Sequence, residues 1–92
     1  MLFKNNVGPQ VRKRRNELGW SQSIFASKLQ IVGWDISRSG VSKVEARLVH
    51  VDDRDLMFLA EALRMEVPDL FPKRDKSCRL HEFMHKLETS RF

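Results

Sequence analysis

Two basic and two hydroxyl side chains between positions 38 and 43 are the clearest candidates for a binding site in this sequence. They are Arg38, Ser39, Ser42 and Lys43. In a helix, at about 100° per residue, these four side chains share one face, and Val41 and Val44 lie on the other. A helix that is apolar behind and basic with small hydroxyls in front suits the major groove of DNA. An arginine can give guanine a bidentate pair of hydrogen bonds, whereas lysine could read a base or only contact phosphate.

Two short helices, each opened by a capping serine, are expected to position these side chains. Ser21 caps the first helix, which should run to about Gln30. The second helix should cover residues 38–47, with either Asp35 or Ser37 as its cap. Two capped helices in succession are the layout of a helix-turn-helix.

Further helices are expected on both sides of this pair. Pro9 near the start and Gly19 past the end delimit a helix over residues 8–18. Trp20 can pack on Phe25 as a hydrophobic staple at the start of the next helix.

The second half of the chain adds three expected helices. Asp52 should cap one that runs to about residue 63, and residues 67–71 should form a short one with proline near its start. After a polar break at 72–77, apolar residues at 80, 83, 84 and 87 predict a last helix. Its apolar stripe over 80–87 could pack in the core, form a dimer contact or bind a partner protein.

The order of residues from about Val7 to Phe71 resembles the lambda-repressor/Cro-like (Xre) family of bacterial and phage regulators. The resemblance implies an all-α, five-helix DNA-binding domain, here with an additional C-terminal helix. We therefore expect a loose N-terminal tail over 1–7, a helix-turn-helix domain over 8–72 and a helical extension over 73–92. One departure stands out, because the connection 30–36 is about four residues longer than the turn usual in the family.

The same resemblance implies which residues contact double-stranded DNA. They are Gln22, Ser37, Arg38, Ser39, Gly40, Ser42, Lys43 and Arg47. In the family, a glutamine at the position that matches Gln22 binds a phosphate and braces the recognition helix. Residues matching Arg15 and Glu45 form a partly buried ion pair in the family, and Arg14 is a rival for the first of these.

Two positions leave two interpretations open. Gly40 lies inside a predicted helix, where glycine costs about 1 kcal/mol relative to alanine. Its missing side chain could let the backbone approach DNA closely, or the residue could be a neutral substitution. Trp34 could fill the space behind the recognition helix, which we favour, or reach a sugar or base.

Charge supports a polyanionic partner. The net charge of the 92 residues is +5, and residues 1–47 hold nine Lys and Arg against three acids. Residues 48–92 hold eight against nine. The positive excess therefore lies in the half that contains the helix-turn-helix.

Other classes of function lack a pattern in this sequence. Cys78 is the single cysteine, which excludes an internal disulfide and fits a cytoplasmic location. No apolar run is long enough for a membrane span, and no signal peptide is expected. Cys78, His81 and His85 have the spacing of metal ligands on a helix, but no fourth ligand stands out, so we expect no metal and no cofactor. Nothing in the sequence argues for an enzyme.

The sequence thus favours a transcriptional regulator, a repressor that binds an inverted repeat as a homodimer. An alternative is an antitoxin-type interaction module whose C-terminal helix binds a partner protein. A third hypothesis is nonspecific nucleic-acid binding through the basic cluster Arg12–Arg15.

Overall fold

The computed structural model of the chain describes residues 3–72, and the regular secondary structure of these residues is all helical, without a strand. Its elements are α1 (Gly8–Glu17), α2 (Gln22–Val32), α3 (Arg38–Glu45), α4 (Asp53–Leu63) and the short 3-10 helix η1 (Val67–Leu70). The expectation of an all-α fold is confirmed for these residues. The last expected helix of the domain is a 3-10 helix of four residues. The predicted C-terminal helix, with its stripe over 80–87, lies outside the described residues.

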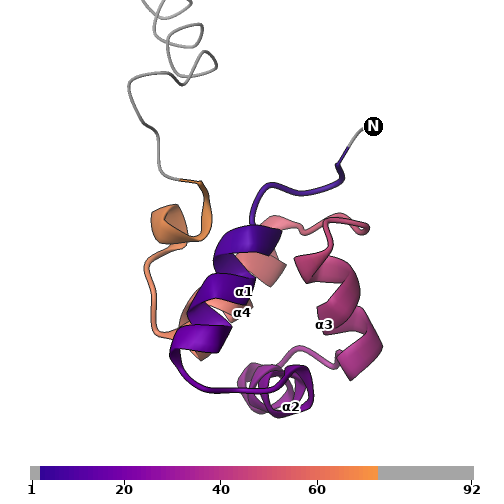
Figure 1. Cartoon of the computed structure of the whole chain (residues 1–92), viewed down its shortest axis with the longest axis vertical. Helices are drawn as coiled ribbons and strands as arrows, with labels where there is room; N and C mark the ends of the chain where they lie inside the picture. Colours follow the sequence, from indigo (N-terminus) through magenta and orange to yellow (C-terminus); the bar gives the residue numbers. More distant parts are fainter. Residues whose placement is uncertain (1–2, 73–92) are drawn as a thin grey trace, which may run out of the picture.

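The helices enclose one core to which every element contributes. In Figure 1, α1 lies in front of α4, with α2 across one end and α3 along one side. The largest fully buried side chains are Val7, Val11, Phe25, Leu29, Val41, Leu59, Leu63 and Leu70. α3 packs against α1 and α2 through its apolar face, so burial of this core fixes the position of α3.

The N-terminal segment is part of this packing, which corrects the expectation of a loose tail over residues 1–7 for its described part. Asn5 Nδ2 donates to Val44 O at 3.2 Å and to Val49 O at 2.8 Å. Its Oδ1 accepts from the backbone N–H groups of Val7 and Gly8. Val7 is only 1% exposed. An apolar side chain and a locally bonded asparagine before α1 therefore hold this segment on the end of α3.

The connection between α2 and α3 is shorter than expected. α2 continues two residues beyond Gln30, to Val32, and ends because Gly33 adopts a left-handed φ of 119°. Gln30 Nε2 then donates to Ile36 O at 2.9 Å. Ser37 is the cap of α3, and its Oγ accepts from Gly40 N at 3.2 Å. About half of the extra length thus becomes an added half turn of helix, and Asp35 is not the cap.

The aromatic side chains around this pair of helices pack as expected. The rings of Trp20 and Phe25 are stacked with centroids 6.2 Å apart, which confirms the staple at the start of α2. Trp34 is half-buried, and its ring centroid lies 6.3 Å from that of Phe58 on α4. Trp34 therefore fills the space between the turn and α4, as favoured from the sequence.

The start of α4 also follows the sequence. Asp52 Oδ1 accepts from Asp55 N at 2.8 Å, and Asp52 N donates to the Asp55 carboxylate at 3.3 Å. This reciprocal pair is a capping box, so Asp52 is the predicted cap.

Candidate nucleic-acid interface

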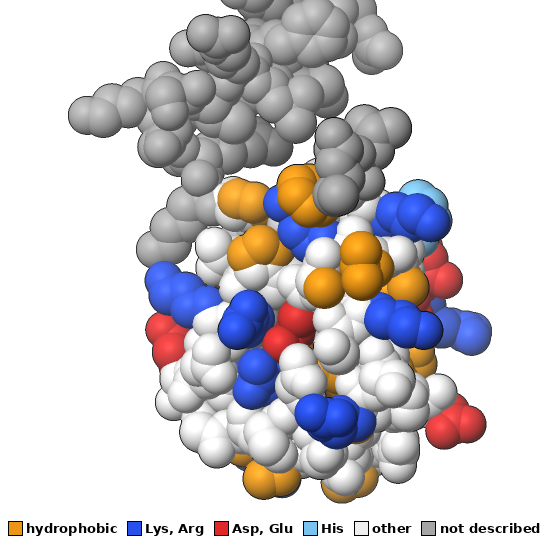
Figure 2. All heavy atoms as spheres, turned by 45° about the vertical axis from the view of Figure 1, so that its right-hand side comes forward, with side chains coloured by type: hydrophobic (Ala, Val, Ile, Leu, Met, Phe, Trp, Pro, Cys, Tyr) orange, Lys and Arg blue, Asp and Glu red, His pale blue; other side chains and the backbone are white. Residues whose placement is uncertain are grey.

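One face of α3 carries the polar and basic side chains expected to contact DNA. Arg38, Ser39, Ser42 and Lys43 are all exposed. On the opposite side of the helix, Val41 and Val44 are 1% and 2% exposed. Figure 2 brings the α3 side of the molecule forward, and Lys and Arg side chains are spread over this face on both sides of a small acidic area. The core therefore decides which side of α3 faces outward.

A buried ion pair connects α3 to α1. Arg15 Nε donates to Glu45 Oε2 at 2.6 Å, and Arg15 Nη2 donates to Glu45 Oε1 at 3.0 Å. The two residues are 8% and 7% exposed, so the predicted pair between Arg15 and Glu45 is confirmed. The hydrogen bond with Glu45 raises the pKa of Arg15 above its ordinary value, and the guanidinium stays charged. The rival Arg14 instead donates to Leu63 O at 3.0 Å.

The same pair connects α3 to the start of α2. Gln22 Nε2 donates to Glu45 Oε1 at 3.2 Å, and Arg15 Nη1 donates to Trp20 O at 2.7 Å. The Glu45 carboxylate thus accepts from two helices at once. The expected bracing of α3 by Gln22 is therefore present. The phosphate contact expected of Gln22 stays a prediction.

The structure explains the glycine at position 40 by a close contact with Ile36, which neither interpretation of the sequence included. A Cβ atom at this position would lie 2.5 Å from Ile36 Cγ1 and 3.1 Å from Ile36 Cδ1. Such approaches are too close for carbon atoms, so any larger residue would push Ile36 out of the core or displace α3. Gly40 thus lets the turn pack closely against α3.

Arg47 follows α3 and contacts the N-terminal segment. Its Nε donates to Asn5 O at 2.9 Å, and its Nη2 donates to Asn6 Oδ1 at 3.0 Å. The guanidinium carbon also lies 3.8 Å from the centre of the Phe3 ring. α3 ends at Glu45, short of the expected residue 47, and Arg47 has a left-handed φ of 65°. The Arg47 side chain therefore bonds to the N-terminal segment, and its expected contact with DNA stays a prediction.

Sequence reasoning missed the role of Asn5 in positioning α3. Its side chain donates to the backbone carbonyl groups of Val44 and Val49, which lie 39 and 44 positions later in the chain. The available signal was an asparagine just before the Gly8-Pro9 helix start, because asparagine often bonds to the backbone two or three residues on. That signal predicts a local turn. The long-range bonds require the fold.

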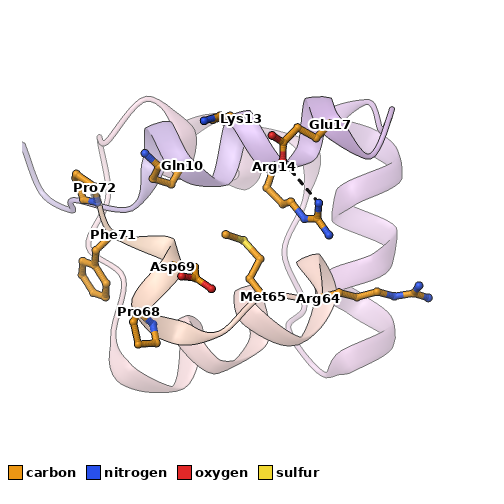
Figure 3. A pocket seen from close by; sticks show the side chains of 10 residues that line it. All are labelled: Gln10, Lys13, Arg14, Glu17, Arg64, Met65, Pro68, Asp69, Phe71 and Pro72. Carbon is orange, nitrogen blue, oxygen red and sulfur yellow. Dashed lines mark ion pairs between the residues drawn. The ribbon is translucent and has the colours of Figure 1, made fainter. Parts of the chain in front are cut away.

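A groove of about 890 Å³ lies elsewhere on the molecule, between α1 and the segment that leads into and out of η1 (Figure 3). Its wall combines the basic Lys13 and Arg64 with the acidic Asp69 and with apolar side chains. Met65 points into the gap beneath α1. This mixed wall does not point to one class of ligand.

Comparisons with protein-family models, curated proteins and solved structures found no match for the chain. Among residues 3–72, no helix has the length and apolar character needed to cross a membrane. The residues Cys78, His81 and His85 lie outside the described part of the chain.

Proposed function

We propose that this chain is a sequence-specific DNA-binding transcriptional regulator, a repressor with the five-helix lambda-repressor/Cro-like fold, in which α3 enters the major groove. One observation carries the proposal. Arg38, Ser39, Ser42 and Lys43 form an exposed face on a helix whose other face is fixed in the core. These side chains offer hydrogen bonds to base edges and phosphates from a helix that fits the groove.

The support beneath α3 favours recognition of a defined sequence. Base readout needs donors that are held in place, because a loosely held side chain loses rotamer entropy on binding. Glu45 anchors α3 to both Arg15 and Gln22, at distances between 2.6 and 3.2 Å. The helix backbone is therefore fixed before DNA binds.

In the proposed complex, the start of α2 lies on the sugar–phosphate backbone. The first backbone N–H groups of a helix lack intrahelical partners and favour an anion. Gln22 is the first residue of α2 and is half-buried, with one amide hydrogen bond to Glu45. A phosphate there would fix the register of α3 on the duplex.

We propose that the protein binds as a homodimer, since one short helix contacts too few bases for useful specificity. A twofold axis would place the two α3 helices in successive major grooves, about 34 Å apart. The second half of the chain is nearly neutral, with eight basic residues against nine acidic ones. Two copies can meet there without the repulsion that the basic half would bring.

Selection of bound sequences from random duplexes tests the proposal, with wild type and Arg38→Ala side by side. Wild type should enrich an inverted repeat whose half-sites are about 10 base pairs apart. Arg38→Ala should lose the preference at one position of each half-site. An unenriched wild-type pool, or identical preferences for both proteins, would refute direct readout by α3. Binding without enrichment would favour the nonspecific hypothesis.

A further inference from the structure

We infer that α1 holds the sugar–phosphate backbone of the same duplex through Arg12 and Lys13, beside the groove that α3 would read. The inference rests on the proposed function. It adds a second contact surface, on a different helix.

The basic cluster Arg12–Arg15 is divided between the interior and the surface of the molecule. Arg15 is 8% exposed and bonded to Glu45 and to Trp20 O. Arg14 is half-buried and donates to the carbonyl oxygen of the last residue of α4. Arg12 and Lys13 are exposed. Two of the four charges therefore hold the fold together, and two face the surroundings.

The two exposed charges, Arg12 and Lys13, lie side by side on the surface of α1. Pro9, Arg12, Lys13 and Asn16 are spaced i, i+3, i+4 and i+7, so they form one stripe along α1. Together with Glu17 and Glu45 they line an open hollow of about 650 Å³. The hollow thus lies between the outer stripe of α1 and the edge of α3.

The hollow borders α3 through Glu45, close to the face proposed to read the bases. Glu45 lies three residues after Ser42, and in a helix such neighbours are adjacent. Ser42 is exposed on the face that would enter the major groove. The edges of the DNA major groove are lined by phosphates. With α3 in that groove, the DNA strand along one edge would pass over the hollow.

The lining of the hollow holds two basic residues, Arg12 and Lys13, and two acidic ones, Glu17 and Glu45. Glu45 accepts from Arg15 and Gln22, so its carboxylate is already compensated. Glu17 has Arg14 as an ion-pair partner at 3.6 Å. Neither acid therefore cancels Arg12 and Lys13, and the hollow remains positive. Because its basic side chains are exposed, a duplex with its row of phosphates and its releasable counterions suits it better than a single small anion.

The test measures the affinity of the full chain for its selected duplex and for an unrelated duplex, between 50 and 200 mM salt. Arg12→Gln, Lys13→Gln and the double variant remove the charge but keep a polar side chain. Arg64→Gln is the matched control, because it removes one exposed charge at the end of α4, and Arg64 does not line the hollow. Thermal unfolding of each variant verifies that the fold is intact.

The slope of log affinity against log salt is negative. The double variant should reduce its magnitude by about 1.8 per monomer, and each single variant should reduce it by about 0.9. Affinity should fall by the same factor for both duplexes, because phosphates carry no sequence information. Arg64→Gln should leave the slope unchanged. Wild-type slopes for Arg12→Gln and Lys13→Gln, or a loss confined to the selected duplex, would overturn the inference and leave the proposed function standing. Failure of wild type to bind either duplex would overturn the proposed function itself.

Discussion

Among single residues, Glu45 has the most contacts that hold α3 in place. It is buried, and it receives two hydrogen bonds from Arg15 and one from Gln22. A resemblance between sequences was enough to predict the partner Arg15. The bond to Gln22 was implied only as a bracing role, because its geometry depends on where α2 starts.

Arg15→Ala should destabilise the protein by about 3–5 kcal/mol, because it leaves a buried carboxylate without its cation. Urea unfolding measures the change. The double variant Arg15→Met/Glu45→Leu provides the comparison and should recover much of the loss, since it removes the desolvated charge together with its partner. If the single variant were no less stable than Arg12→Ala, which alters an exposed residue, the buried pair would not hold α3 as described.

Gly40→Ala should also destabilise the protein, by about 1–3 kcal/mol, although alanine is the better helix former. The new Cβ would lie 2.5 Å from Ile36 Cγ1. Ile36→Ala removes the atoms that clash, so the two substitutions should be strongly coupled in a double-mutant cycle. Additive effects in urea unfolding would show that Gly40 is not needed for this packing.

At the scale of elements, helix starts were easier to predict than helix ends. Ser21, Ser37 and Asp52 each accept the bond expected of a cap. The end of α2 was predicted at about Gln30, two residues before its observed end at Val32. Gly33 carried the correct local signal, since glycine readily adopts the left-handed conformation that ends a helix. The alternative caps of α3 needed the structure, because both side chains can accept such a bond.

The start of α4 has a pH dependence that follows from Asp55. Burial raises the pKa of Asp55 above its ordinary value and outweighs the hydrogen bond from Asp52 N, which lowers it. The folded state then binds this proton more tightly than the unfolded state. Stability from this group is present below the ordinary aspartate pKa of about 3.9 and is lost as pH rises through the higher folded pKa.

Asp55→Asn should therefore gain stability relative to wild type as pH rises from 3 to 6, since the amide stays neutral and can still accept the capping bond. Asp53→Asn is the control for loss of a charge in the same helical turn. Urea unfolding at each pH gives the free energies. A difference between the two variants that did not change with pH would contradict the raised pKa.

At the scale of the whole molecule, the N-terminal segment and the basic half of the chain act together. The sequence predicted the excess of positive charge in residues 1–47, but it did not show which charges are engaged inside the fold. Arg47, which was expected on DNA, donates hydrogen bonds to Asn5 and Asn6 within the fold, and its contact with DNA stays a prediction. Contacts between residues some 40 positions apart do not appear in any local pattern, which is why the packed segment was expected to be loose.

Asn5→Ala should lower the unfolding free energy by about 1–3 kcal/mol, because it removes the hydrogen-bond partner of Val49 O and of the backbone N–H groups of Val7 and Gly8. Asn6→Ala is the control, since Asn6 is exposed and accepts one bond, from Arg47. Thermal and urea unfolding compare them. Equal stabilities of the two variants would show that the segment does not support the fold.

Readout of the DNA sequence by α3 can be measured as the ratio of the affinities for the selected duplex and for an unrelated one. We expect Arg38→Ala to reduce this ratio by about 5- to 140-fold, which corresponds to about 1–3 kcal/mol for one lost bidentate contact. Arg64→Ala, which alters an exposed arginine at the end of α4, should leave the ratio unchanged. If the ratio stayed at the wild-type value in Arg38→Ala, or if it was close to one in wild type, α3 would not read the DNA sequence through Arg38.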